Sequence, residues 1–162
     1  MSIELEVEMG ETNVPIREFL RKLSAELASR CTKDSMLDPR EWVLEKHLDA
    51  ILGGEECNFE ITIHHLAAIA VACLWIPQVS PGKPGWWVSM TALTRCPEGM
   101  FLLTAAAASL AQIAGKLVVD DALLLGVEPT LSPSQVFSLL PKPGRRSFQD
   151  AATEFGKVHR LW

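Results

Sequence analysis

The chain has 162 residues, 48% of them hydrophobic, and a formal net charge of −5 at pH 7. A chain of this length is expected to form one domain whose core needs neither a disulfide nor a metal. Its longest apolar run, 66–76, is far shorter than the roughly 20 residues of a membrane-spanning helix, so we expect no membrane partner. The N-terminus has neither the basic nor the apolar region of a secretory signal. We therefore expect a soluble, cytoplasmic protein whose four cysteines stay reduced.

The charge is unevenly distributed along the chain. Residues 1–60 contain 14 acidic and 7 basic side chains, whereas residues 61–162 contain 6 acidic and 8 basic ones. The main basic cluster, Arg145-Arg146 with Lys142 nearby, is too small for the basic patch of a nucleic-acid-binding protein. We expect no nucleic-acid partner. The acidic N-terminal third would suit a basic protein partner, although such faces are most often simply solvated.

The first third of the sequence predicts one strand and two helices. Apolar residues alternate with glutamates over residues 3–9, which is typical of a strand with one wet face. Asn13 is the expected cap of a helix over 13–27. The cap, proline and glutamate within 38–41 predict a second helix that ends at Gly53-Gly54.

The middle of the chain predicts two strands and two helices. Residues 57–63 alternate like a strand, with the start of a helix as the alternative, and the alanine-rich segment 64–75 predicts a helix. After a Pro/Gly loop, residues 86–94 predict a strand with Trp86 toward the core and Trp87 on the other side. A helix is expected over 97–114, with Gly115 as its stop.

The last third predicts a short strand over 116–120, with a helical continuation as the alternative, and then a loop over 126–130. Ser132-Pro133-Ser134-Gln135 is typical of a helix start, so a short helix is expected over 133–140, and another is expected over 147–160 after a Pro/Gly link. The whole order favours an α+β fold, a single globular domain over 1–162 in which a small, antiparallel sheet is covered by helices on one face. An all-α domain is the alternative if the segments 59–63 and 116–120 are helical.

Five residues are the candidate partner-binding positions. Tryptophan is enriched at interaction hot spots, so we select the pair Trp86-Trp87 after the Pro/Gly loop and Trp162 at the end of the last helix. An acidic pair stands between two apolar runs. Each has a structural alternative, because tryptophans also pack against their own core and aspartates also cap turns. The positions are Trp86, Trp87, Asp120, Asp121 and Trp162.

Residues for catalysis are less well marked. His64 and His65 are adjacent, so on a helix their side chains would point about 100° apart and could not jointly chelate one metal. A small enzyme or ligand-binding domain would combine them with Asp120 or Asp121, or with a cysteine such as Cys73 or Cys96, of which Cys73 is expected in the core. The sequence contains no Walker A loop, no Rossmann fingerprint, no GxSxG and no HExxH. We predict no catalytic residue, no metal site and no cofactor.

A non-catalytic protein-binding domain is therefore the first functional hypothesis, and the small enzyme is its alternative. Among such domains, a toxin-neutralising immunity protein fits the small acidic format. The helix that ends in Ala114-Gly115, together with the segment 116–121 after it, resembles a stretch of about 20 residues in some immunity proteins, too short to identify a family. Only 7 of the 81 residues over 61–141 are charged. So apolar a segment must be covered by the chain's own helices or by a second copy, which makes a homodimer an expectation as well.

Overall fold

The computed structural model describes residues 3–31, 42–44, 50–63, 66–77, 84–126 and 128–159, and for 42–44 it describes the backbone alone. Within these ranges the chain forms helices and strands in a mixed order. The helices are α1 (Ile16–Arg30), α2 (Pro97–Ala114), α3 (Pro133–Leu139) and α4 (Phe148–His159). The strands are β1 (Glu4–Gly10), β2 (Val14–Pro15), β3 (Trp42–Leu44), β4 (Ile51–Leu52), β5 (Cys57–Ile63), β6 (Ala67–Ile76), β7 (Gly85–Ala92), β8 (Val118–Val119) and β9 (Thr130–Leu131).

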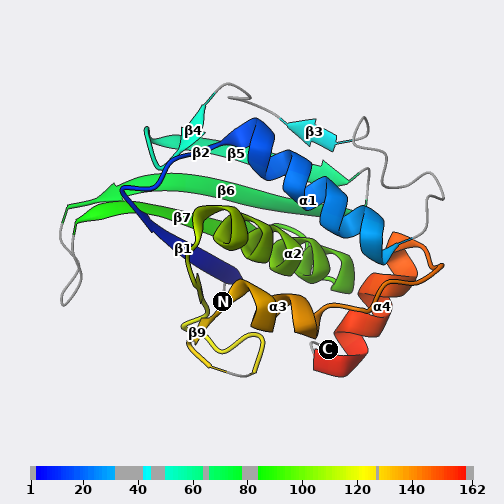
Figure 1. Cartoon of the computed structure of the whole chain (residues 1–162). Helices are drawn as coiled ribbons and strands as arrows, with labels where there is room; N and C mark the ends of the chain where they lie inside the picture. Colours follow the sequence, from blue (N-terminus) through cyan, green and yellow to red (C-terminus); the bar gives the residue numbers. More distant parts are fainter. Residues whose placement is uncertain are drawn as a thin grey trace.

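Seven strands make one antiparallel sheet in the order β3-β5-β6-β7-β1-β8-β9, and β2 pairs with β4 apart from it. In Figure 1 the helices lie across one face of this sheet. Along β1, β5, β6 and β7 every second side chain is buried on that face, as the period of two predicts, except for Trp75 and Trp86 at one end of β6 and β7. The α+β prediction is confirmed. The all-α alternative is wrong, because residues 57–63 and 118–119 pair as strands.

Helix α2 lies at the centre of the core. Every residue from Gly99 to Ala111 is buried. The helix packs on β1, β6 and β7, and α1, α3 and α4 pack around it. A helix that is apolar on all sides is stable only where it is covered on all sides. This position explains much of the low charge of 61–141 within a single chain.

Small residues let the neighbours approach α2 closely. A Cβ built on Gly99 would lie 2.1 Å from the Thr94 carbonyl oxygen, so only glycine fits where the helix begins. The run Ala105–Ala108 presents a methyl group on every side. The helix ends at Gly115, whose φ of 65° is left-handed, as the sequence predicts. In the described part of the chain, no helix combines the length and apolarity that a membrane crossing requires.

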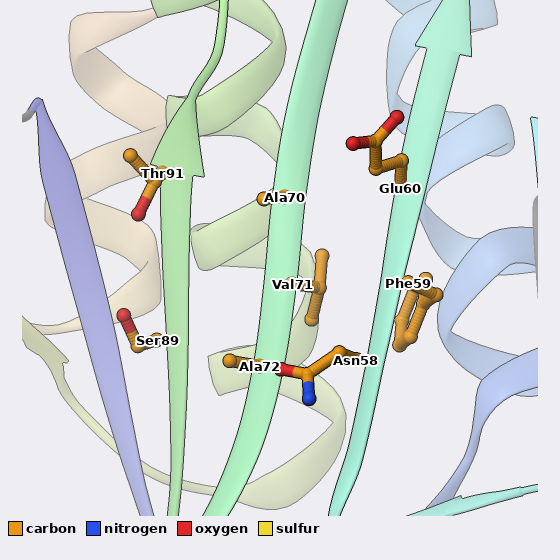
Figure 2. A pocket seen from close by; sticks show the side chains of 8 residues that line it. All are labelled: Asn58, Phe59, Glu60, Ala70, Val71, Ala72, Ser89 and Thr91. Atoms are coloured by element: carbon orange, nitrogen blue, oxygen red, sulfur yellow. The ribbon is translucent and has the colours of Figure 1, made fainter.

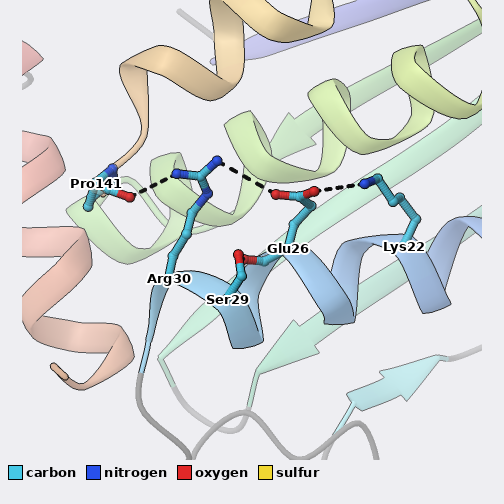
Figure 3. Close-up of polar contacts among 5 residues, drawn as sticks. All are labelled: Lys22, Glu26, Ser29, Arg30 and Pro141. Carbon is cyan, nitrogen blue, oxygen red and sulfur yellow. Dashed lines mark hydrogen bonds and ion pairs between the residues drawn. The ribbon is translucent and has the colours of Figure 1, made fainter. Parts of the chain in front are cut away.

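A set of polar contacts joins the end of α1 to the segment between α3 and α4 (Figure 3). Arg30 Nη1 donates a hydrogen bond of 2.9 Å to the Pro141 carbonyl oxygen. Glu26 holds the Arg30 guanidinium at 3.6 Å and the Lys22 ammonium at 2.7 Å. The Phe137 ring on α3 also takes part, since Arg30 Cζ and Lys22 Nζ each lie 5.7 Å from its centroid. These contacts hold α1 against the C-terminal helices.

Two predicted helices are wrong. Within the segment expected as a helix over 38–52, residues 42–44 form β3 and 51–52 form β4, while 38–41 and 45–49 lie outside the described residues. Residues 67–76 form the long central strand β6 rather than a helix. Alanine favours helix in isolation, but here tertiary pairing on both sides, to β5 and β7, overrides that preference. The sheet is larger than expected for the same reason.

Smaller corrections concern loops and caps. Thr130-Leu131, expected within or beside a loop, adds β9 to the sheet edge by pairing with β8. The cap of α1 is Pro15 without a side-chain hydrogen bond, so Asn13 is not its cap. The predicted start of α3 is confirmed, because Ser132 and Gln135 form a reciprocal capping box. The predicted strands around 4–9, 57–63, 86–92 and 118–119 are also confirmed.

Replacing a central alanine of α2 tests how tightly this helix is enclosed. Ala107 is fully buried, so Ala107→Leu adds three carbons where no space is open. We expect the free energy of unfolding to fall by about 1–3 kcal/mol, measured by urea denaturation. Gln112→Leu on the exposed side of the same helix is the control and should have little effect. Equal losses in the two variants would contradict the enclosure of α2.

Candidate functional site

The face of the large sheet that the helices leave uncovered is the candidate functional site, and we call it the open face. Its side chains belong to the strand residues that alternate with the buried ones and point away from the helices, and all of them are exposed or half-buried. Polar, acidic and small residues dominate it, because this set never joins the core. Over the described residues the open face consists of Glu4, Glu6, Glu8, Asn58, Glu60, Thr62, Ala68, Ala70, Ala72, Leu74, Ile76, Trp87, Ser89, Thr91, Val119 and Thr130.

Strand register lines these residues up in rows that cross the sheet. One row runs Glu60, Ala70, Thr91 and Glu4 across four strands. The next row runs Asn58, Ala72, Ser89 and Glu6, and it continues to Val119 on β8. Each row therefore has an alanine near its middle with hydrogen-bonding side chains on both sides.

The alanines of β6 form the floor of a shallow trough (Figure 2). Its volume is about 300 Å³, and Asn58 and Glu60 line one side while Ser89 and Thr91 line the other. Alanine methyls are shorter than the flanking side chains, which is why the surface dips along β6. An apolar floor between polar walls suits an aliphatic or guanidinium-bearing side chain from outside.

The β1 side of the open face is strongly acidic. Glu4 accepts a hydrogen bond from the Ser89 hydroxyl. Glu4, Glu6 and Asp121 line a second hollow of about 230 Å³ with Val119. Partial burial, and then the charges of Glu4 and Asp121, raise the pKa of Glu6 above its ordinary value of 4.5. A cation placed here would relieve this repulsion.

The two adjacent tryptophans lie on opposite faces, as the sequence predicts. Trp86 packs against the core, and its ring meets Trp75 edge-to-face at a centroid distance of 5.4 Å. Trp87 lies on the open face, where it pairs with Leu74 on one side and Glu8 on the other. Its indole Nε1 is buried without a hydrogen-bond partner among the described residues. Trp75 and Leu74 are 43% and 41% exposed, so this end of the β6-β7 ribbon is apolar on both faces.

The two adjacent aspartates also separate. Asp120 is fully buried, and its carboxylate oxygens accept hydrogen bonds of 2.8 and 2.9 Å from the backbone N–H groups of Leu124 and Leu125. It fastens the turn after β8, which is the structural alternative that the sequence offered. It has no surface with which to contact a partner. Asp121 is exposed beside the acidic end of the open face.

The remaining candidates form no site among the residues that the structure describes. His64, His65 and Trp162 lie outside the described residues. Cys73 is buried in β6, as expected, and Cys96 is the half-buried N-cap of α2. No group of three metal-ligating side chains occurs among the residues that the structure describes. Of the sequence candidates that the structure describes, Trp87 lies on the open face and Asp121 lies beside it.

Sequence reasoning missed the β5 and β6 contributions to this site. Asn58, Glu60 and the alanines of β6 were not candidates, although alanine at every second position from 68 to 72 was the available signal. The helix predicted over 64–75 concealed it. Comparisons with protein-family models, with curated proteins and with solved structures found no match to this chain, so the site rests on its own geometry.

The two adjacent aspartates allow a matched test, because replacing the buried one and replacing the exposed one should change stability differently. Asp120→Ala leaves two backbone N–H groups without acceptors, and we expect the free energy of unfolding to fall by about 1–3 kcal/mol. Asp121→Ala, next to it but exposed, should change stability by less than about 0.5 kcal/mol. Chemical denaturation of both variants measures this. A larger loss from Asp121→Ala would refute the assigned roles.

The raised pKa of Glu6 predicts a pH dependence of stability. Because this pKa is higher in the folded chain than in the unfolded one, the folded state holds more protons, and stability is lost as pH rises through the raised pKa. Glu6→Gln should therefore stabilise the protein at pH 7, and the gain should vanish as pH falls below the ordinary glutamate value. Thermal melting between pH 4 and pH 8 measures it, with exposed Glu11→Gln as the control. A gain that is independent of pH would count against this cause.

Proposed function

We propose that the protein is a non-catalytic protein-binding domain whose open face receives a basic protein partner. The observation behind the proposal is the uncovered face itself, which joins an apolar trough to acidic side chains. Glu60 lies on one side of the trough, and Glu4 and Glu6 lie on the other. A partner that presents arginine or lysine at this spacing would bury its aliphatic stems over the alanines and pair its charged ends with the carboxylates.

The charges on the open face also favour a basic partner. Partial burial is the first cause of the raised pKa of Glu6, and repulsion by Glu4 and Asp121 adds to it. A basic surface brought against them replaces repulsion with attraction and speeds the encounter. Trp87 and Leu74, at the end of the trough, add the aromatic and apolar contact area at which interfaces concentrate their binding energy.

The specific form that we propose is a toxin-neutralising immunity protein. Such a protein inhibits by occupying a surface of another protein, so it needs an exposed complementary face and no catalytic residues of its own. The open face supplies the first requirement for a basic target. If the partner that is captured on this face is toxic when expressed alone and harmless when co-expressed with this chain, the specific form is supported. A captured partner that is not toxic would leave a binding domain of another kind.

Site-specific photo-cross-linking in the native host tests the binding face. A photoreactive residue at Thr91, in the middle of the open face, is expected to capture one protein of net positive charge. The same residue at Gln112, on the exposed side of α2, should not capture it. Glu60→Lys should lower the yield at Thr91 at least about tenfold, because an opposed like charge costs several kcal/mol.

Glu18→Lys is the matched control, since it makes the same change in net charge on an exposed position of α1. Its cross-linking yield should stay within about twofold of the parent chain, because a screened charge on the far side contributes little. The proposal fails if Thr91 captures nothing, if Gln112 captures the same protein, or if the two charge reversals have equal effects.

A further inference from the structure

A second feature, independent of the open face, lies within the core at one end of β5 and β6. Cys57 and Cys73 are directly opposite one another on these antiparallel strands. Both side chains point to the helix side of the sheet, where they are 4% and 0% exposed. Facing residues in an antiparallel pair have Cα atoms about 4.5–5.5 Å apart, which falls inside the range that a disulfide requires.

From this pairing we infer that Cys57 and Cys73 are an oxidisable dithiol that forms a reversible disulfide when the protein meets a hydroperoxide. The other two cysteines are not arranged in this way. Cys31 follows α1, and Cys96 caps α2 with its sulfur 3.8 Å from the Leu66 carbonyl oxygen.

The surroundings of the two sulfurs give them different chemistry. The Gly53 backbone N–H donates to Cys73 Sγ at 3.2 Å, and the Cys57 thiol hydrogen-bonds to it as well. These donors lower the pKa of Cys73 and favour its thiolate, while the same contact and burial raise the pKa of Cys57. Because the Gly53 N–H donates to the Cys73 sulfur and stabilises a thiolate there, we assign Cys73 as the nucleophile and Cys57 as the resolving thiol.

The reaction balances in two steps. The Cys73 thiolate attacks one peroxide oxygen, the O–O bond breaks, and the leaving hydroxide takes up a proton to become water, which leaves a sulfenic acid on Cys73. The Cys57 sulfur then attacks the Cys73 sulfur, the S–O bond breaks, and the leaving hydroxide departs as water with the Cys57 proton. The two sulfurs lose two electrons, which the two peroxide oxygens gain. A thiol reductant reverses the product by exchange.

A small oxidant suits this site better than a bulky one. Both thiols are buried, so a reagent reaches them only when the structure opens locally. The turn over 53–56, which precedes β5 and whose Gly54, Glu55 and Glu56 are exposed, is the adjacent segment where such an opening can occur. Hydrogen peroxide is close to water in size and enters through a local opening of such a turn. A tripeptide disulfide would need a much larger opening.

The disulfide would tie β5 to β6 at the end of the sheet that carries the exposed Leu74 and Trp75. Cross-linking residues 57 and 73 restricts the unfolded chain more than the folded one, because the two positions are already paired in the fold. We expect the oxidised protein to melt about 6–12 °C higher than the reduced protein.

The test treats the whole, folded chain with hydrogen peroxide, blocks remaining thiols, and maps the products by mass spectrometry without reduction. The expected product has lost two hydrogen atoms, contains a linked Cys57–Cys73 peptide and returns to the reduced melting temperature with dithiothreitol. In Cys57→Ala, Cys73 should stop at the sulfenic acid, which a cyclic diketone traps. In Cys73→Ala, Cys57 should remain a thiol.

Cys31→Ala is the matched control, because burial raises the pKa of that thiol to about 11 and no partner sulfur faces it. This variant should form the disulfide at the parent rate. The inference is overturned if the folded parent chain keeps both thiols, if Cys73 oxidises without linking to Cys57, or if the link appears only in denaturant. A link to Cys31 or Cys96 would overturn it equally. These readouts do not depend on any partner of the open face.

Discussion

The burial of α2 is the constraint on which the rest of the structure depends. From Gly99 to Ala111 the helix has no polar side, so water must be excluded from its whole circumference. The sheet covers one side, and α1, α3 and α4 cover the others. Removal of any one cover would expose alanine and leucine side chains to water. Much of the low charge of 61–141 follows from this enclosure within one chain, and that part needs no second copy to cover it.

The same arrangement decides what the other face of the sheet looks like. Because the other three helices of the described part of the chain gather around α2, none of them covers the open face (Figure 1). That face therefore meets water with small, polar and acidic side chains. The fold thus explains why this face is exposed and why it is polar.

Sequence patterns predicted the elements whose local and tertiary preferences agree. The alternation of β1, the capping box of α3 and the glycine stop of α2 each have one local solution, and each was predicted correctly. The alanines of β6 have two solutions, since alanine favours helix unless neighbouring strands are available on both sides. Those neighbours, β5 and β7, are brought there by the whole fold. The trough could not be predicted for that reason, because it exists only if β6 is a strand.

Two pairs of adjacent, identical residues each contain one residue that supports the fold and one that faces the candidate site. The side chains of neighbouring residues point in different directions, and this separates their roles. Trp86 packs inward and Trp87 outward, while Asp120 fastens a turn and Asp121 faces water. In each pair the chemistry is the same, and only the direction of the side chain differs. The outward members join glutamates from β1 and β5, so the candidate surface is assembled across strands rather than along one segment. A site read across a sheet in this way leaves no short motif in the sequence.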